Sequence, residues 1–224
     1  MQTFVVRVWI PDRPGALGQV ASRIGAVRGD VVGIDILERG AGRAIDELVV
    51  QLPDATLVDL LVSEIQDVDG ADVEDVRPVG DEGHDPRLDA LETAALLVGA
   101  MTADELGRLL AEQAAYDFGA EWAAVVDLAE PALRAAVGAA PEPVWLAAFL
   151  HGSGASEHLA TGEVGPDDLA WAPLPSAGLT LVLGRSGRPL RARERRQAAA
   201  LARIADVRWA EVAVASAQTR HPAG

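Results

Sequence analysis

The spacing of apolar residues over positions 1–80 predicts four strands and two helices. β-branched and aromatic residues predominate at positions 3–10, 31–38, 44–52 and 71–79, which is typical of strands. Apolar residues at helical spacing predict helices over 14–28 and 53–68. The second helix is expected to bury Leu57, Leu60, Leu61, Val62 and Ile65. The resulting βαββαβ order indicates the ferredoxin-like arrangement of the α+β class, an antiparallel sheet with two helices on one face.

The turn between the first strand and the first helix is the segment around which this half is organised. Pro11, Asp12, Pro14 and Gly15 interrupt the strand pattern, and Asp12 is the expected N-cap of a helix that starts at Pro14. A helix N-terminus offers free backbone N–H groups and the positive end of a dipole, which suits a small carboxylate. The alternative is an ordinary strand-to-helix turn in which Pro and Gly only shape the backbone.

The second half of the chain has a different pattern. Polar, glycine-rich residues 81–86 indicate a linker between a domain at 1–80 and one at 87–215, with a flexible tail at 216–224. Helices are expected at 88–99, 103–118 and 190–215, and strands at 121–128, 132–137, 169–174 and 179–184. Thr102 and Glu105 form a candidate capping box. Residues 143–151 fit a helix or a buried strand, and 151–166 fit a loop.

Composition narrows the classes of function. The formal net charge of −15 argues against nucleic acid and against an anionic membrane surface as general partners. Cys, Lys and Asn are absent, which excludes disulfides, thiolate chemistry and a phosphate-loop lysine. No apolar segment reaches the roughly 18 residues of a membrane helix, and Met1 leads directly into a strand. We therefore expect a soluble, cytoplasmic protein.

The motif Asp12-Arg13-Pro14-Gly15-Ala16-Leu17, placed between the first strand and helix of a βαββαβ order, resembles that of an ACT domain. Members of that family are small regulatory modules that pair and bind amino acids where the first loop of one copy meets the second strand of its neighbour. The resemblance covers residues 3–79 and implies a homodimer. It implies effector contacts from Asp12, Arg13, Gly15, Ala16 and Leu17, with Ile34 and Asp35 across the interface.

Residues 87–212 resemble a GAF domain, a sensory module that binds small molecules on one face of its sheet. The resemblance rests on Ala172-Pro173-Leu174, residues 179–185, Arg188-Pro189-Leu190 and Arg193-Glu194, which are similar to the family's last strands and their turn into the final helix. The Asn-Lys-Phe-Asp-Glu set of the cyclic-nucleotide members and the bilin-attaching Cys are missing. Trp122, Trp145, Phe149 and Trp171 are candidates to line a second pocket, with a plain core role as the alternative.

Residues that could carry catalysis or bind metal do not form a recognisable constellation. His84, His151, His158 and His221 lack metal-site spacing, and Ser153 lacks the context of a nucleophile elbow. We expect no metal, no cofactor and no enzymatic activity. Five arginines between Arg188 and Arg196 form a basic cluster, for which we favour pairing with acidic residues over a phosphate site.

The sequence therefore predicts a ligand-sensing homodimer that binds an amino acid or similar metabolite at an ACT-like interface, with a GAF-like domain that senses a second signal or relays the first. Its output is expected to run through a regulated protein partner. Two alternatives remain: a scaffold that dimerises without binding a ligand, and an enzyme with a pocket in residues 87–212.

Overall fold

The computed structural model describes residues 1–79, 85–153, 162 and 165–220. The chain divides into two compact units, Met1–Asp85 and Pro86–Gly224. Both are mixtures of helices and antiparallel sheet, so the protein is of the α+β class. Three expected segments lie partly outside the described residues: the linker, the 151–166 loop and the tail. His84, His158 and His221 lie entirely outside them.

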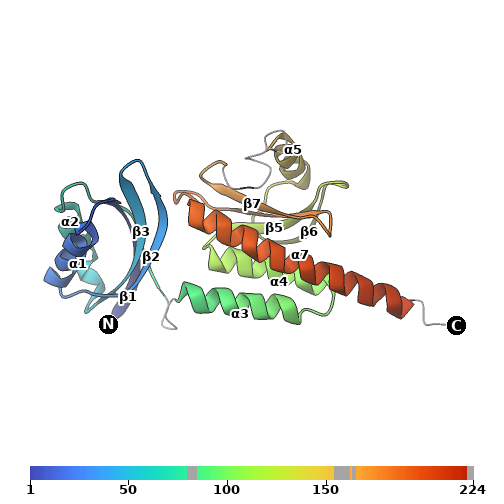
Figure 1. The fold of residues 1–224 in the computed structure, drawn as a ribbon, viewed down its shortest axis with the longest axis horizontal. Coiled ribbons are helices and arrows are strands. Elements are labelled where there is room, and N and C mark those ends of the chain that lie inside the picture. The colour runs from blue at the N-terminus through green and yellow to red at the C-terminus, as the bar shows by residue number, and fades with distance from the viewer. Residues whose placement is uncertain (80–84, 154–161, 163–164, 221–224) are drawn as a thin grey trace. The chain divides into compact units, whose positions relative to one another are not determined.

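The first unit contains one four-stranded sheet and two α-helices in the order βαββαβ. Its strands are β1 (Gln2–Pro11), β2 (Asp30–Gly40), β3 (Arg43–Leu52) and β4 (Asp72–Pro78). They lie in the order β2-β3-β1-β4, and each neighbouring pair is antiparallel. The helices α1 (Ala16–Ala26) and α2 (Val58–Gln66), the latter preceded by a 3-10 turn at Ala55–Leu57, lie on one face of the sheet (Figure 1).

The alternation of side chains along β1 explains why the helices cover that face. We call the face that α1 and α2 cover the helix face. Every second side chain of β1 points to it, namely Phe4, Val6, Val8 and Ile10. Val20, Ile24, Leu61 and Ile65 of the two helices complete this core. The same alternation places the intervening residues Val5 and Arg7 on the opposite face, where both are buried. Leu60 was expected in the core, but its side chain is 48% exposed because its position on α2 turns it away from the sheet.

The start of α1 differs from the expected start. The expectation that Asp12 caps a helix beginning at Pro14 is wrong: α1 begins at Ala16, and its N-cap is Gly15 with no side-chain cap. The backbone N–H of Asp12 donates instead to the carbonyl of Gly42 in the turn between β2 and β3, at 2.9 Å. This bond keeps Asp12 beside the sheet, so the chain needs three more residues to turn into the helix.

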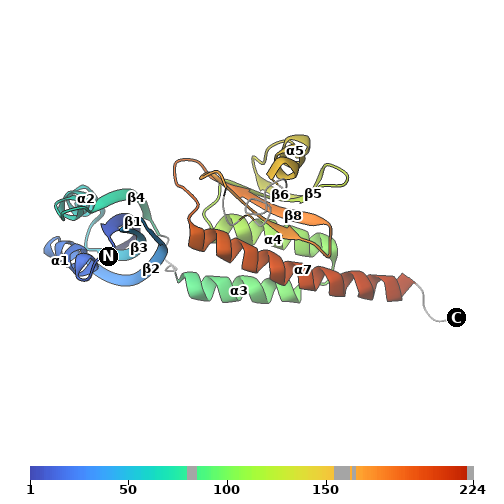
Figure 2. The ribbon, with the colours of Figure 1, turned by 45° about the horizontal axis from the view of Figure 1, so that its top comes forward.

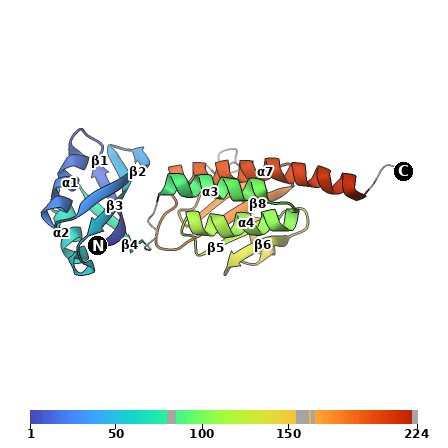
Figure 3. The same cartoon turned by 90° about the horizontal axis from the view of Figure 1, so that it is seen from below.

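The second unit contains a four-stranded antiparallel sheet in the order β6-β5-β8-β7. Its strands are β5 (Trp122–Asp127), β6 (Ala132–Gly138), β7 (Leu169–Leu174) and β8 (Leu179–Gly184). The helices are α3 (Pro86–Gly99), α4 (Ala103–Asp117), α5 (Pro143–Ser153) and α7 (Ala192–Arg220). Helices α4 and α7 pack on one face, α3 packs against both, and α5 lies on the other face (Figures 2 and 3).

Two local predictions in this unit are settled by the structure. Residues 143–153 are a helix, in which Leu146, Ala147 and Leu150 are buried at helical spacing. The Thr102 cap is confirmed, since its Oγ1 accepts a hydrogen bond from the N–H of Glu105 at 3.2 Å. The carboxylate of Glu105 closes the turn through the N–H of Met101 at 2.8 Å, one residue before the cap.

Candidate functional site

The corner between β1 and α1 is built from a tight turn followed by an uncapped helix. Gly15 has a φ of 87°, a left-handed conformation that costs other residues free energy. Ala16 is buried beneath the turn, Leu17 is half-buried, and Asp12 and Arg13 are exposed. No side chain caps the helix at Gly15. The N–H of Ala16 donates to the carbonyl of Arg13 at 3.3 Å, and the next N–H groups of the first turn point toward the end of the helix.

The two residues expected from the second strand lie on opposite faces of the sheet. Ile34 pairs with Leu48, whose side chain is in the core beneath the helices, so Ile34 lies on the helix face with the corner. Asp35 pairs with Glu47 on the other face. The structure therefore places the corner and Ile34 on one side and Asp35 on the other, because consecutive strand residues alternate.

Asp46 was not singled out from the sequence, yet it lies on the helix face close to the corner. It pairs with Val8 on β1 and Ile36 on β2, and it is 2% exposed. Its Oδ1 is buried and accepts no hydrogen bond. Burial raises the pKa of Asp46; the charge of Arg39 opposes this shift, and the charge of Asp12 adds to it. The sequence signal was an acidic residue at a core-facing position of an apolar strand.

The edge of this sheet carries an apolar row. Strand β2 is the last in the order, so one side of its backbone has no neighbour within the sheet. Val32, Ile34 and Ile36 on this strand are 51%, 42% and 38% exposed. We call these three residues the β2 row. Exposed apolar residues on an unpaired edge strand are typical of surfaces that pair with another chain.

A cleft of about 490 Å³ lies beside the corner, between α1 and the end of α2. Arg13 and Arg23 line one side of it, and Asp67 and Asp69 line the other. Arg13 donates to Gln19 at 3.5 Å, and Arg23 pairs with Glu64 at 3.0 Å. The cleft thus presents both signs of charge next to the predicted effector loop.

The opposite face of the sheet holds a buried ionic network. The guanidinium of Arg7, which is fully buried, contacts Glu47 at 2.8 Å, and Arg77 contacts the same carboxylate at 3.0 Å. Burial alone would raise the pKa of Glu47, but the charges and hydrogen bonds of Arg7 and Arg77 outweigh it and lower the pKa to about 2. These contacts join β1, β3 and β4 through one carboxylate, which marks the network as structural.

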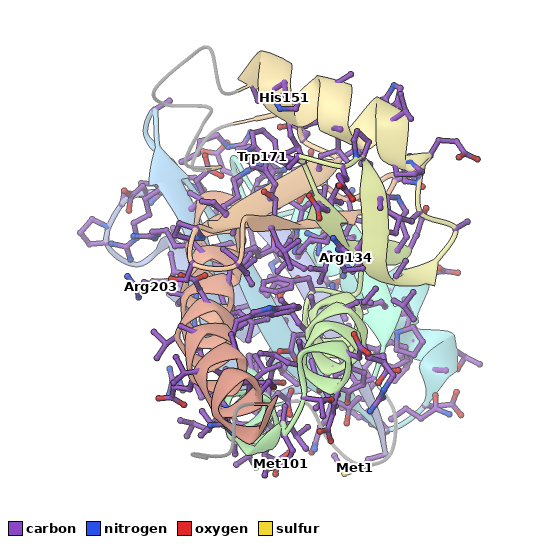
Figure 4. The ribbon with its side chains drawn as sticks, turned by 90° about the vertical axis from the view of Figure 1, so that its right-hand side faces the viewer. Met1, Met101, Arg134, His151, Trp171 and Arg203 are labelled. Atoms are coloured by element: carbon purple, nitrogen blue, oxygen red, sulfur yellow. The ribbon has the colours of Figure 1, made fainter. Side chains whose placement is uncertain are left out.

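Three of the four aromatic candidates in the second unit form a stack. The rings of Trp145 and Phe149 on α5 are parallel, with centroids 5.6 Å apart, and Trp171 on β7 meets Phe149 edge-on at 5.2 Å. Trp122 packs against the same cluster between the sheet and α5. Figure 4 shows Trp171 beneath α5. Trp171 is buried, whereas Trp145 is 50% exposed, so the stack runs from the core to the surface.

The basic cluster before and within α7 is engaged with the chain's own backbone. Arg188 donates to the carbonyls of Phe118 and Gly119, and Arg195 donates to the carbonyl of Pro166. Arg196 donates to the carbonyl of Ala192. Nearby, the buried Arg185 pairs with Glu194 at 2.7 Å, and Glu194 also accepts from the N–H of Arg191. The ion pair with Glu194 belongs to Arg185, which precedes the cluster, and the side-chain bonds of Arg188, Arg195 and Arg196 go to carbonyl groups, so pairing of the cluster with acids stays a prediction.

Neither a metal-binding cluster nor a membrane-spanning helix occurs among the described residues. Across these residues, no group of three or more His, Asp or Glu side chains is arranged to hold a metal ion. None of the described helices is both long enough and apolar enough to cross a membrane.

Comparisons with known proteins give distant likenesses only. No protein-family model and no curated protein matches this chain. A solved structure of an unknown protein from Galdieria sulphuraria is similar over 81% of this chain and 78% of its own, at 17% identity and a TM-score of 0.32. A formyltetrahydrofolate deformylase from Pseudomonas putida KT2440 matches 43% of this chain, at 16% identity and a TM-score of 0.27; the match spans 38% of that chain. Neither likeness is close enough to bear on function.

Proposed function

We propose that the first unit is an ACT-like regulatory domain that binds an amino acid or a similar small metabolite, and that the protein acts as a homodimer. The βαββαβ order and the strand order β2-β3-β1-β4, with α1 and α2 on one face, support this proposal. They are the arrangement that the ferredoxin-like resemblance implies.

The observation that carries the proposal is the pairing of an uncapped helix start with an exposed apolar edge. The corner at Gly15 supplies a helix N-terminus that no side chain caps, and its positive dipole end suits a carboxylate. Ile34 and Ile36 of the β2 row supply apolar surface on the same face of the sheet. A second copy that covers this row buries it, and a ligand held between the two copies links ligand binding to the arrangement of the dimer.

We propose further that the second unit is a GAF-like sensory or relay domain. Its sheet carries α4 and α7 on one face and the single described helix α5 on the other, and α5 supplies Trp145 and Phe149 to the aromatic stack. A half-exposed aromatic stack of this kind suits a flat organic ligand. Output through a regulated protein partner is part of the same proposal.

A scaffold that dimerises without a ligand is the second candidate. The β2 row favours it, because an apolar edge promotes pairing whether or not the corner is occupied. The two functions differ in one property: only the sensor binds an amino acid saturably and with selectivity for its side chain.

Sedimentation combined with titration calorimetry on the full chain tests the proposal. We expect the wild-type protein to sediment as a dimer and to bind one amino acid or a related few. Ile34→Asp places a charge in the β2 row and should yield a folded monomer that has lost binding. Leu60→Asp, at an exposed apolar position on α2, is the matched control and should retain both properties. A monomeric wild-type protein, or Ile34→Asp binding as tightly as wild type, contradicts the proposal; a dimer without any binding supports the scaffold.

A further inference from the structure

The buried carboxylate of Asp46 has no evident structural purpose within the described residues. It lies on the helix face between Ala44 and Leu48, two residues of the apolar core, and its register neighbours are Val8 and Ile36. Its Oδ1 is buried and accepts no hydrogen bond. Burying such a group without a partner costs free energy, and folded proteins satisfy nearly all buried polar atoms. The position therefore calls for a ligand or another functional explanation.

The surroundings of Asp46 indicate the kind of group that would pair with it. A carboxylate that lacks a donor is best satisfied by a cationic N–H group, through a charge-assisted hydrogen bond. The neighbouring corner provides the complementary feature, because the uncapped N-terminus of α1, a helix of 11 residues, favours an anion. The Asp46 carboxylate can bind a cation and the N-terminus of α1 can bind an anion. Because the two lie on the same face and close to one another, together they match the two charges of a zwitterion.

We propose that Asp46 is the specificity-determining residue of the effector site and that it accepts the ammonium group of an α-amino acid whose carboxylate lies at the N-terminus of α1. The inference rests on the proposed function of the first unit and adds the residue that distinguishes an amino acid from other carboxylic acids. Access comes from the edge of the sheet, where Ile36 is 38% exposed and both Asp12 and Arg39 are exposed. Because Asp46 is 2% exposed, ligand entry requires these rim side chains to move.

Calorimetric titration of the full chain tests the assignment with defined probes. The probes are the proteinogenic amino acids and, for each, the carboxylic acid that lacks the ammonium group, such as propionate for alanine. We expect the wild-type protein to bind its amino acid at least about tenfold more tightly than the matching acid, as the loss of a charge-assisted bond implies. Asp46→Asn should weaken binding of the amino acid by about tenfold or more and leave binding of the acid within about threefold.

Two controls separate this role from a structural one. Asp46→Asn removes a buried charge without changing the side-chain shape, so its melting temperature should equal or exceed that of wild type. Asp69→Asn changes an exposed acid that lines the cleft beside the corner, and it should bind the amino acid as wild type does.

The possible outcomes distinguish the inference from the function on which it rests. If wild type binds an amino acid and Asp46→Asn binds it equally well, the assignment of Asp46 is wrong while the proposed function stands. Equal affinity of wild type for the amino acid and its deamino acid overturns the assignment without any variant. Loss of binding in Asp69→Asn alone moves the site to the cleft. Absence of binding to every probe overturns both the assignment and the proposed function.

Discussion

The guanidinium of Arg7 lies 2.8 Å from the carboxylate of Glu47 on the face of the first sheet opposite α1 and α2. Strands β1 and β3 are antiparallel neighbours, and Arg7 pairs directly with Glu47 across them. Arg77 on β4 contacts the same carboxylate at 3.0 Å, so the network spans three adjacent strands. It ties the strand that leads into the corner to the rest of the sheet.

This network makes stability depend on pH in acid. Because the pKa of Glu47 is lowered from 4.5 to about 2, the unfolded state binds more protons between these values, and stability falls as pH drops through that window. The stabilisation is fully present above pH 4.5 and amounts to about 3 kcal/mol. Urea unfolding at a series of pH values should show wild type losing this much more than Glu47→Gln between pH 5 and pH 2.

The matched control for Glu47 is a surface ion pair. Glu64 pairs with Arg23 at 3.0 Å on the exposed faces of α1 and α2, and Glu64→Gln should change stability by less than about 1 kcal/mol at pH 7. At the same pH, Glu47→Gln should cost about 3 kcal/mol or more, because it leaves Arg7 buried without its main partner. If the two substitutions changed the free energy of unfolding equally, the buried network would contribute no more to stability than the surface ion pair does.

Two glycines near the corner should respond oppositely to alanine. Both Gly15 and Gly18 have open space where a Cβ would stand, but Gly15 has a φ of 87° and Gly18 lies within α1. Gly15→Ala should lower the free energy of unfolding by about 1 kcal/mol through backbone strain. Gly18→Ala should raise it by up to about 1 kcal/mol through helix propensity. Chemical denaturation checks both; a stabilising Gly15→Ala would contradict the left-handed turn.

A half-buried carboxyl group between α3 and α4 should act in the opposite pH direction to Glu47. Burial raises the pKa of Asp117 to about 6, a hydrogen bond from Thr93 opposes the shift, and the charge of Asp89 adds to it. The folded state then binds the extra proton between about pH 4 and 6, so stability falls as pH rises through that window. Asp117→Asn should raise stability by about 2 kcal/mol at pH 7, with the gain disappearing below pH 4.

The comparison for Asp117 is an exposed acid on the same helix. Asp104 lies in the first turn of α4, where a negative charge is favourable. Asp104→Asn should lower stability at pH 7 by about 0.5 kcal/mol, which is opposite in sign to the effect of Asp117→Asn. Stabilisation by both substitutions would indicate a general effect of the acidic net charge.

The aromatic stack in the second unit should separate into core and surface members. Trp171 is buried, so Trp171→Ala should cost about 3–5 kcal/mol of stability. Trp145 is 50% exposed and stacks on Phe149, so Trp145→Ala should cost only about 1 kcal/mol. Thermal unfolding followed by circular dichroism measures both, and similar costs would mean that the stack is not ordered as described.

Much of the fold could be predicted because most elements have a clear hydrophobic period. Strands Leu169–Leu174 and Leu179–Gly184 have the bounds that the sequence indicates, and all of their residues except Pro173 are buried. The choice between helix and strand at 143–151 could not be made, because an apolar run of this length is buried in either form. The helix continues to Ser153, so the expectation of a loop from residue 151 is wrong at its start.

The details of the candidate site depend on hydrogen bonds and strand register between residues far apart in the chain, which the local sequence pattern does not predict. Asp12 fails as a cap because its N–H bonds to Gly42, 30 positions away in the chain. Alternation separates Ile34 and Asp35 onto two faces, but the register of β2 with β3 decides that Ile34 is the one on the helix face. Asp46 becomes a buried, unsatisfied acceptor only once that register places it beneath the helices.

The central claim is that this chain binds an amino acid, and thermal unfolding of the full-length protein tests it most directly. The screen covers all proteinogenic amino acids and common nucleotides, each at millimolar concentration. An amino acid at 100 times its dissociation constant adds about 2.7 kcal/mol to the free energy of unfolding, which gives a clear rise in melting temperature. We predict such a rise with one amino acid or a few of similar side chain. Unchanged melting temperatures with every compound would contradict the claim and leave the first unit as a dimerisation module.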